Sequence, residues 1–211
     1  MTWGSWNQWG ALGNGSNKSS YKPQKILEQV KDISVDASDE DNFDTGAAIK
    51  EDGSLWTWGN NKCGALGNSS EDEYSLKPQK IMDSVKKVNF QDSSGAAIKE
   101  DGSLWIWGDI KRIGNGSIEK KEMSVPQKIM ENVKDVKISR DTCLAIKEDG
   151  SLWNYANDVW GENPQYNDTP KKIMENVKSI YLPSYGAYNI PWSVVAVSYT
   201  HLRAHETPEH L

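Results

Sequence analysis

The residue types that most often carry enzyme chemistry are few in this 211-residue chain and are poorly placed. All three histidines lie in the last 14 residues, so no Ser–His or Cys–His pair can be built in the rest of the chain. His201 and His205 have the i, i+4 spacing of helical metal ligands. Cys63 and Cys143 fall at different points of a repeated pattern, which favours two ordinary thiols over a disulfide or metal site. The sequence predicts a protein that is not an enzyme, with no cofactor and no metal.

Carboxylates are densest in residues 36–44, which contain five acidic side chains and one phenylalanine. A twelve-residue calcium loop needs a glycine at its sixth position and a closing glutamate, and this stretch has neither. Two interpretations remain, a solvated acidic loop or a contact surface for a basic protein partner. In the second interpretation, the contact residues are Asp39, Glu40, Asp41 and Phe43.

A second candidate contact surface is the aromatic, proline-flanked segment 183–192. Aromatic side chains on loops are enriched in the cores of protein–protein interfaces. We therefore expect Tyr185, Tyr188 and Trp192 to contact a protein partner.

The elements that would position these loops are predicted by an internal repeat. The string Ala-Ile-Lys-Glu-Asp-Gly-Ser-Leu-Trp occurs three times, at steps of 49 and 48 residues. Asp-Gly between two short apolar runs is a strong β-hairpin signal, because both turn positions need positive φ. The structural turn residues are Asp52, Gly53, Asp101, Gly102, Asp149 and Gly150.

A second repeated block begins with proline at Pro23, Pro78, Pro126 and Pro170. Apolar residues at i, i+4 and i+7 behind a proline are also typical of an amphipathic helix. Alternation of apolar and polar residues over 133–138 instead favours a strand, and the polar residues between the two apolar runs fit a turn. We expect strand, turn, strand and keep the helix as the alternative.

The order of these motifs, with Trp-Gly and Gly-Ala-Leu-Gly after them, resembles the regulator of chromosome condensation repeat over about residues 3–197. The resemblance implies an all-β fold, a β-propeller of four-stranded blades that is typically seven-bladed, of which about 3.5–4 repeats are present. Residues 198–211 leave the pattern and resemble a translated sequencing-adapter read-through, so they are expected to be non-native. The expected segments are 1–22 (closing strand and loop of an incomplete blade), repeats 23–77, 78–125 and 126–169, an incomplete repeat 170–197, and the tail.

In such a propeller, the Asp-Gly turns and the turns inside the proline block lie on one face and are nearly uniform. The other face varies, because the connection before the Ala-Ile strand is 6 and 7 residues longer in the first and fourth repeats than in the middle two. The Gly-Ala-Leu-Gly-Asn loops at 10–14 and 64–68 lack the Lys-Ser/Thr ending of a phosphate loop, so we expect them to pack between blades. Insertions on one face often mark the binding face of a repeat protein.

The net charge of −6 argues against nucleic-acid binding, and no apolar run reaches the roughly 20 residues of a membrane span. The sequence predicts a protein-binding scaffold that acts through its variable loops. The resemblance implies two alternatives, nucleotide exchange on a small GTPase and β-lactamase inhibition. Regular Lys/Asn-rich repeats favour a bacterial protein that is extracellular or on the cell surface, and exposed blade edges predict self-association.

Overall fold

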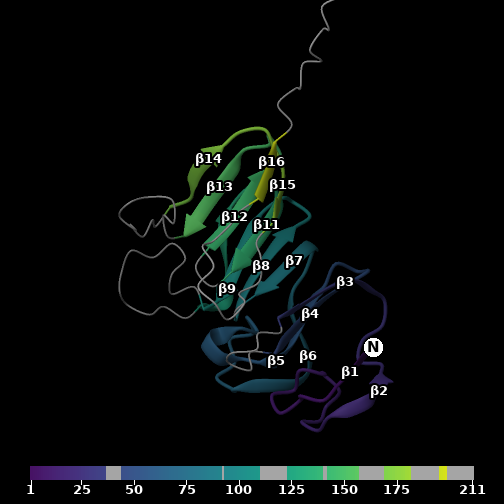
Figure 1. Cartoon of the computed structure of the whole chain (residues 1–211). Helices are drawn as coiled ribbons and strands as arrows, with labels where there is room; N and C mark the ends of the chain where they lie inside the picture. Colours follow the sequence, from purple (N-terminus) through teal and green to yellow (C-terminus); the bar gives the residue numbers. More distant parts are fainter. Residues whose placement is uncertain are drawn as a thin grey trace, which may run out of the picture.

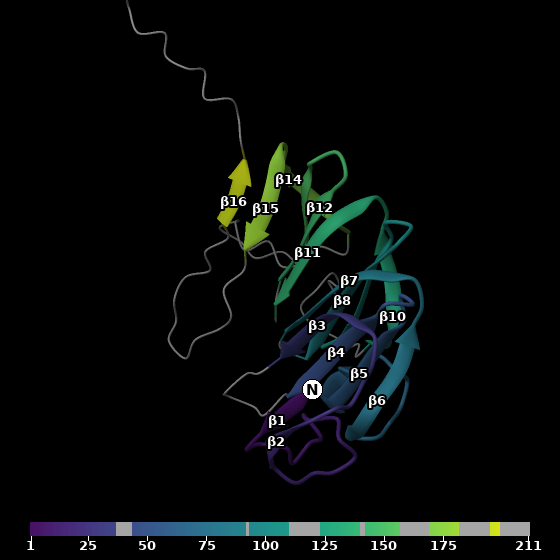
Figure 2. The ribbon, with the colours of Figure 1, turned by 90° about the vertical axis from the view of Figure 1, so that its right-hand side faces the viewer.

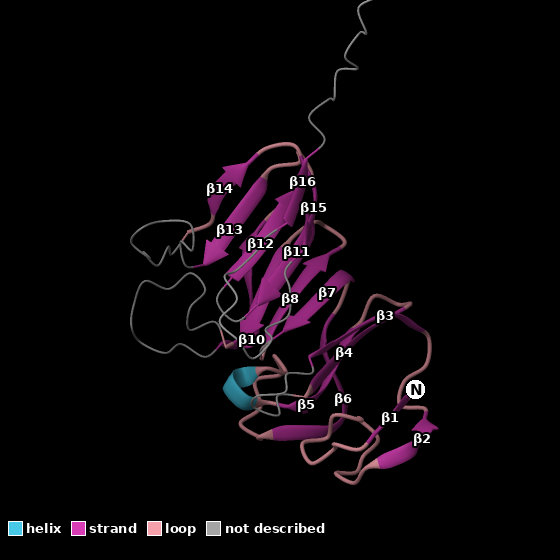
Figure 3. Ribbon diagram, in the orientation of Figure 1, coloured by secondary structure: helices cyan, strands magenta, loops and turns pink. Residues whose placement is uncertain are grey.

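A computed structural model describes residues 1–36, 44–91, 93–109, 123–139, 142–156, 169–181 and 195–198 (Figure 1). These residues form β-strands and one short 3-10 helix, η1 (Lys62–Gly64), as Figure 3 shows. The first strands are β1 (Thr2–Gly4), β2 (Ser20–Gln24), β3 (Val30–Asp36), β4 (Thr45–Lys50), β5 (Leu55–Asn60) and β6 (Tyr74–Met82). Next come β7 (Val85–Gln91), β8 (Ser94–Lys99), β9 (Leu104–Gly108), β10 (Met123–Met130) and β11 (Val133–Ser139). The last are β12 (Thr142–Lys147), β13 (Leu152–Ala156), β14 (Lys171–Met174), β15 (Val177–Tyr181) and β16 (Val195–Ser198).

The strands form three complete four-stranded antiparallel sheets, β3–β6, β7–β10 and β11–β14, which fan out side by side as blades (Figure 2). The predicted all-β propeller architecture is confirmed. Each blade takes three strands from one sequence repeat and its outer, fourth strand from the next repeat. The proline strand β6, for example, pairs with β5 of the preceding repeat. Sequence repeats and blades are therefore offset by one strand.

The proline block is strand, turn, strand, as preferred from the sequence, and the helical alternative is wrong. In the second copy, β6 ends at Met82 and β7 begins at Val85. Ser84 lies in the two-residue connection with φ of 60°, and the equivalent Asn132 and Asn176 have φ of 60° and 59°. Short polar residues tolerate this left-handed conformation better than β-branched ones. The connection reverses the chain and starts a new blade.

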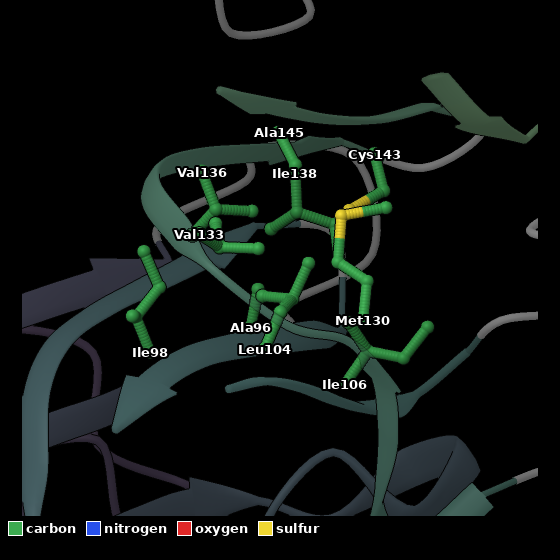
Figure 4. Close-up of a cluster of buried hydrophobic side chains, with 10 residues drawn as sticks. All are labelled: Ala96, Ile98, Leu104, Ile106, Met130, Val133, Val136, Ile138, Cys143 and Ala145. Atoms are coloured by element: carbon green, nitrogen blue, oxygen red, sulfur yellow. The ribbon is translucent and has the colours of Figure 1, made fainter. Parts of the chain in front are cut away.

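The hydrophobic core lies between blades rather than inside them. The innermost strand of each blade packs on the face of the blade before it, so that Val85 and Phe90 of β7 lie against Ile49 and Leu55 of the first blade. The next interface repeats this arrangement (Figure 4). Its buried side chains are Ala96, Ile98, Leu104, Ile106, Met130, Val133, Val136, Ile138, Cys143 and Ala145. A third cluster joins β12 and β13 to β15. Stability therefore comes from stacking of neighbours, as in other repeat proteins.

Two half-sheets lie at opposite ends of the arc of blades (Figures 1 and 2). At one end β1 pairs with β2, and at the other β15 pairs with β16. The residues Thr2-Trp3-Gly4 of β1 are equivalent to Thr57-Trp58-Gly59 of β5, so β1–β2 has the strand types of the outer half of a blade. The register of β15–β16 matches that of β11–β12, the inner half of a blade.

Candidate binding face

One face of the arc is formed by tight turns that hydrogen-bond to one another across blade boundaries. The Val85 amide at the start of the second blade donates to the Gly53 carbonyl of the first blade, at 2.8 Å. Its neighbour Ser84 accepts, through its carbonyl, a 2.8 Å bond from the Glu100 amide of the second blade. The same pair of bonds recurs at the next boundary, between Val133 and Gly102 and between Glu148 and Asn132. We call this surface the turn face. It is formed by the turns at residues 28–29, 51–54, 83–84, 100–103, 131–132, 148–151 and 175–176.

The repeated Asp-Gly-Ser-Leu-Trp string has a local structural role on the turn face. Asp101 accepts hydrogen bonds from the backbone amide and the hydroxyl of Ser103, at 2.8 and 2.6 Å. The Ser103 hydroxyl in turn accepts a 2.9 Å bond from the Trp105 indole, and the Lys99 ammonium lies 5.1 Å from the centre of that ring. The serine bonds lower the pKa of the Asp101 carboxyl. The other two copies have the same contacts. All six predicted turn residues lie in these connections, but the predicted two-residue turn with positive φ at both positions is wrong. Only the glycines have positive φ, and the Gly53 amide donates to the Lys50 carbonyl in a connection that runs from Glu51 to Ser54.

The opposite surface, which we call the loop face, begins with a loop wrapped around a buried asparagine. The Asn61 side-chain amide donates to the carbonyls of Ser70 and Asp72, and its oxygen accepts the Leu66 amide at 3.0 Å. Asn7 has the same role in the first loop, where it binds Ser16, Lys18 and Leu12. These two asparagines were missed by sequence reasoning, although both follow a Trp-Gly pair by two or three residues.

The glycine-rich part of each loop reaches the next blade. The Ala65 carbonyl accepts a 2.9 Å bond from the buried Trp107 indole, and Ala11 accepts the same bond from Trp58. At Gly67 a Cβ atom would lie 2.8 Å from the Trp107 ring, and φ there is +67°. The loop therefore packs between blades, as predicted from its sequence.

A pocket of about 740 Å³ opens on the loop face between the first two loops. Its described lining includes Gln8, Trp9, Asn60, Asn61, Lys62, Cys63, Gly64, Ser69, Ser70, Glu71, Asp72, Glu73 and Ser124. Trp9 meets Tyr74 edge to face with 5.9 Å between ring centres, which gives the pocket one aromatic wall. Three consecutive carboxylates against a single lysine make the described lining acidic.

The predicted acidic loop connects to this pocket through Asp44. Asp39, Glu40, Asp41 and Phe43 lie outside the described residues. The connection that contains them leaves β3 at Asp36 and enters β4 at Thr45, and these two residues pair at the loop-face end of the sheet. The Asp44 carbonyl accepts a 3.0 Å bond from the amide of Asn60, which lines the pocket. Partial burial raises the pKa of the Asp44 carboxyl.

The predicted aromatic residues Tyr185, Tyr188 and Trp192 also lie outside the described residues, as does the tail with its three histidines. Their connection leaves β15 at Tyr181 and enters β16 at Val195, again at the loop-face end. The described part of the chain contains no group of three His, Cys, Asp or Glu residues able to hold a metal ion. No helix among the described residues is long and apolar enough to cross a membrane.

Sequence reasoning also missed a set of bulged lysines near the turn face. In β3, Val30 pairs with Lys50 and Asp32 with Ile49, so Lys31 is the extra residue of a β-bulge. The same irregularity recurs in β7, β11 and β15, where the extra residues are Lys86, Lys134 and Lys178. Lys31 approaches the Glu100 carboxylate at 3.6 Å, but both side chains are well exposed, so this pair contributes little stability. The sequence signal was the recurring Val-Lys-x-Val/Ile.

Comparison with known proteins agrees with this architecture. Residues 2–39 and 52–96 match the model of the Regulator of chromosome condensation (RCC1) repeat. A comparison with curated protein sequences gave no match. Two stretches of the chain are therefore similar to the regulator of chromosome condensation repeat, and the described residues fold as part of a β-propeller.

Solved structures show the same fold. Human WBSCR16 superimposes with a TM-score of 0.64 at 18% identity, covering 79% of this chain and 45% of that protein. Yeast RCC1 (Prp20) bound to Kap60 superimposes with a TM-score of 0.59 at 18% identity, covering 80% of this chain and 43% of that protein. Prp20p from Saccharomyces cerevisiae superimposes with a TM-score of 0.58 at 18% identity, covering 80% of this chain and 44% of that protein. That structure is described together with the binding of Prp20p to Gsp1p and histones. The chain spans less than half the length of these proteins.

Proposed function

We propose that this protein is a non-enzymatic binding scaffold whose loop face takes a basic protein partner. The main support is the contrast between the two faces. On the turn face, the repeated turns bond to one another in the same way at successive blade boundaries. On the loop face, the connections differ in length, a pocket opens, and its described lining is acidic. Propellers with this repeat include protein-binding scaffolds and GTPase regulators, so protein recognition is in keeping with the fold.

The partner class follows from charge and shape. Glu71, Asp72 and Glu73 lie together on the pocket wall with Trp9 nearby. Carboxylates attract Lys and Arg side chains, and an aromatic ring adds a cation–π surface for them. Asp36 and Thr45, which flank the rest of the acidic stretch in the sequence, pair at the same end of the first blade. A lysine- or arginine-rich segment of a protein fits this surface better than an acidic one.

The test uses fluorescent peptides of equal length with net charges from −4 to +4, titrated with the whole chain. Basic peptides should bind, and binding should weaken as salt rises. Reversing the pocket charges with Glu71→Lys, Asp72→Lys and Glu73→Lys should weaken basic-peptide binding at least tenfold. Reversing three turn-face charges with Glu51→Lys, Glu100→Lys and Glu148→Lys is the matched control and should change it less than threefold. Equal binding of acidic and basic peptides, or equal losses in both variants, would refute the proposal.

Shortening the acidic loop gives a second test. Replacing residues 37–43 by a short Gly-Ser linker should weaken peptide binding while the melting temperature stays within a few degrees. Binding that is unchanged by this replacement would show that the loop is not part of the surface.

A second candidate function is regulation of a small GTPase, favoured by the description of Prp20p together with its binding to Gsp1p. The matching measurement is release of a fluorescent guanine nucleotide from a panel of small GTPases with and without the protein. Acceleration of release would replace the scaffold proposal by this one.

A further inference from the structure

The two loops that meet at the loop-face pocket share one framework. Buried Asn7 and Asn61 make equivalent hydrogen bonds, and each loop contains the string Gly-Ala-Leu-Gly-Asn. Aligned on these asparagines, Trp9 is equivalent to Cys63, and residues 71–73 are Glu-Asp-Glu where the first loop has Asn-Lys-Ser. Trp9, Cys63 and residues 71–73 all line the pocket. The loops therefore agree in the residues that hold their shape and differ at positions that line the pocket.

The acidic segment 71–73 is exposed, but its backbone is fixed by one buried residue. The Asn61 side chain donates to the carbonyls of Ser70 and Asp72, and the Asn61 backbone amide donates to the Glu73 carbonyl at 2.8 Å. The Ser70 hydroxyl also donates a 2.8 Å bond to the Asp72 carboxylate, which sets the direction of that group. The segment is thus ordered before a partner binds, and this lowers the entropy cost of binding.

Trp9 offers an aromatic surface that is not used inside the protein. It is half-buried, and it meets Tyr74 edge to face with 61° between the ring planes. Trp56, Trp105 and Trp153 each have a lysine ammonium of their own blade 4.6–5.8 Å from the ring centre. The described residues place no lysine over Trp9 in this way. A cation from a partner can therefore take the place that an internal lysine takes at the other three rings.

From these observations we infer, building on the proposed function, that the pocket selects arginine over lysine in its basic partner. The guanidinium stacks on the Trp9 ring and donates hydrogen bonds to the carboxylates of residues 71–73. A guanidinium is planar, weakly hydrated and carries five N–H donors in a fixed fork, so it can stack and donate at the same time. An ammonium is a compact, strongly hydrated charge that gains less from the ring. The open pocket of about 740 Å³ has room for the whole side chain.

Three peptides on one Gly-Ser background, carrying four arginines, four lysines or four citrullines, test the inference in titrations with the whole chain. The arginine peptide should bind about fivefold more tightly than the lysine peptide, the gain expected from one cation on a partly exposed ring. Citrulline keeps the planar shape without the charge, so its peptide should bind most weakly. Reaction of Cys63 with DTNB should slow when the arginine peptide is bound, because Cys63 lines the same pocket.

Variants of the first loop assign the preference to one ring. Trp9→Leu should bring the ratio of arginine to lysine affinity close to one, and Trp9→Phe, which keeps an aromatic face, should retain part of it. Trp6→Leu is the matched control, because Trp6 is 70% exposed in the same loop and lies outside the described lining of the pocket. It should keep the full ratio. Near-ultraviolet circular dichroism checks that each variant is folded.

The outcomes separate this inference from the proposed function. Equal binding of all three peptides would refute the basic-partner proposal itself. Arginine and lysine peptides that bind equally, and both more tightly than the citrulline peptide, would leave that proposal standing and overturn the arginine preference. A preference that survives in folded Trp9→Leu and Trp9→Phe, or a Cys63 reaction that the bound arginine peptide does not slow, would also overturn it.

Discussion

Trp107 lies directly across from Gly95 in the neighbouring strand of the second blade. A Cβ atom at position 95 would lie 2.3 Å from the Trp107 indole, a distance that real Cβ atoms do not show. Gly46 and Trp58 repeat this relationship in the first blade, at 2.4 Å. In the third blade the equivalent pair is Cys143 and Tyr155, so a smaller ring faces a larger neighbour. The identity of one residue is therefore coupled to the identity of its cross-strand partner.

Gly95→Ala should destabilise the protein by about 3 kcal/mol, because the new methyl group overpacks a buried ring that also holds the preceding loop. The midpoint of urea unfolding, followed by tryptophan fluorescence, measures the effect. Gly4→Ala is the matched control, since its Cβ would meet only the Leu12 side chain at an ordinary 3.7 Å. Equal midpoints for the two variants would show that the Trp107 site relaxes freely.

Asn61→Ala should cost about 2–4 kcal/mol, because it leaves two carbonyls and one amide of the buried loop without their partner. It should also weaken binding of basic peptides, since Glu71, Asp72 and Glu73 follow directly from this loop. Ser69→Ala is the control in the same loop, because its exposed hydroxyl donates to the carbonyl of the adjacent Asn68. Hydrogen exchange of residues 60–73 reports the loop, and unchanged protection in the Asn61 variant would contradict the prediction.

The fold could be predicted well from the sequence because the repeated motifs show the length of the structural unit and the order of its strands. Asp-Gly between strand-forming runs determines the hairpins, and three copies show that the units must stack. The offset between repeat and blade was not predictable in this way, because a repeated string does not show which copy a strand pairs with. The pocket was not predictable either. It depends on two loops, around Trp9 and around Glu71, that are far apart in the sequence and meet only because consecutive blades pack side by side.

Stability should fall in acid through the three turn aspartates. Hydrogen bonds from serine lower the pKa of the Asp52, Asp101 and Asp149 carboxyls below the ordinary value for aspartate. A carboxyl whose pKa is lower in the folded than in the unfolded state stabilises the fold when the pH lies above its unfolded-state pKa. That stabilisation is lost as the pH falls through the folded-state pKa. The urea midpoint should therefore drop as pH falls below about 3.8, in keeping with that linkage. Asp44, with a raised pKa, acts in the opposite sense.

The variant that tests this acid effect combines Ser54→Ala, Ser103→Ala and Ser151→Ala. It should be less stable than the parent at pH 6 and should lose less stability on acidification, because its aspartates no longer accept the serine bonds. Ser19→Ala, at an exposed serine away from these turns, should leave the profile unchanged. Parallel profiles for the parent and the triple variant would show that the serines do not set the acid response.

The two cysteines should differ sharply in reactivity. Burial raises the pKa of the Cys143 thiol to about 12, whereas Cys63 lies half-buried at the pocket. At pH 8 a thiol reagent such as DTNB should therefore titrate one thiol per native chain and two in denaturing guanidinium. Cys63→Ser should abolish the native reaction. Rapid reaction of two thiols in the native parent would contradict the buried position of Cys143.

The offset of one strand between repeats and blades has a consequence for how such a gene can change. Each repeat gives its first strand to the preceding blade and receives a closing strand from the repeat that follows. Copying or deleting one unit of about 48 residues therefore leaves each remaining sheet with four strands and each boundary with the same pair of hydrogen-bonded turns. Recombination between the nearly identical strings can change the number of blades in whole steps, and selection then acts on the loops that each added blade brings.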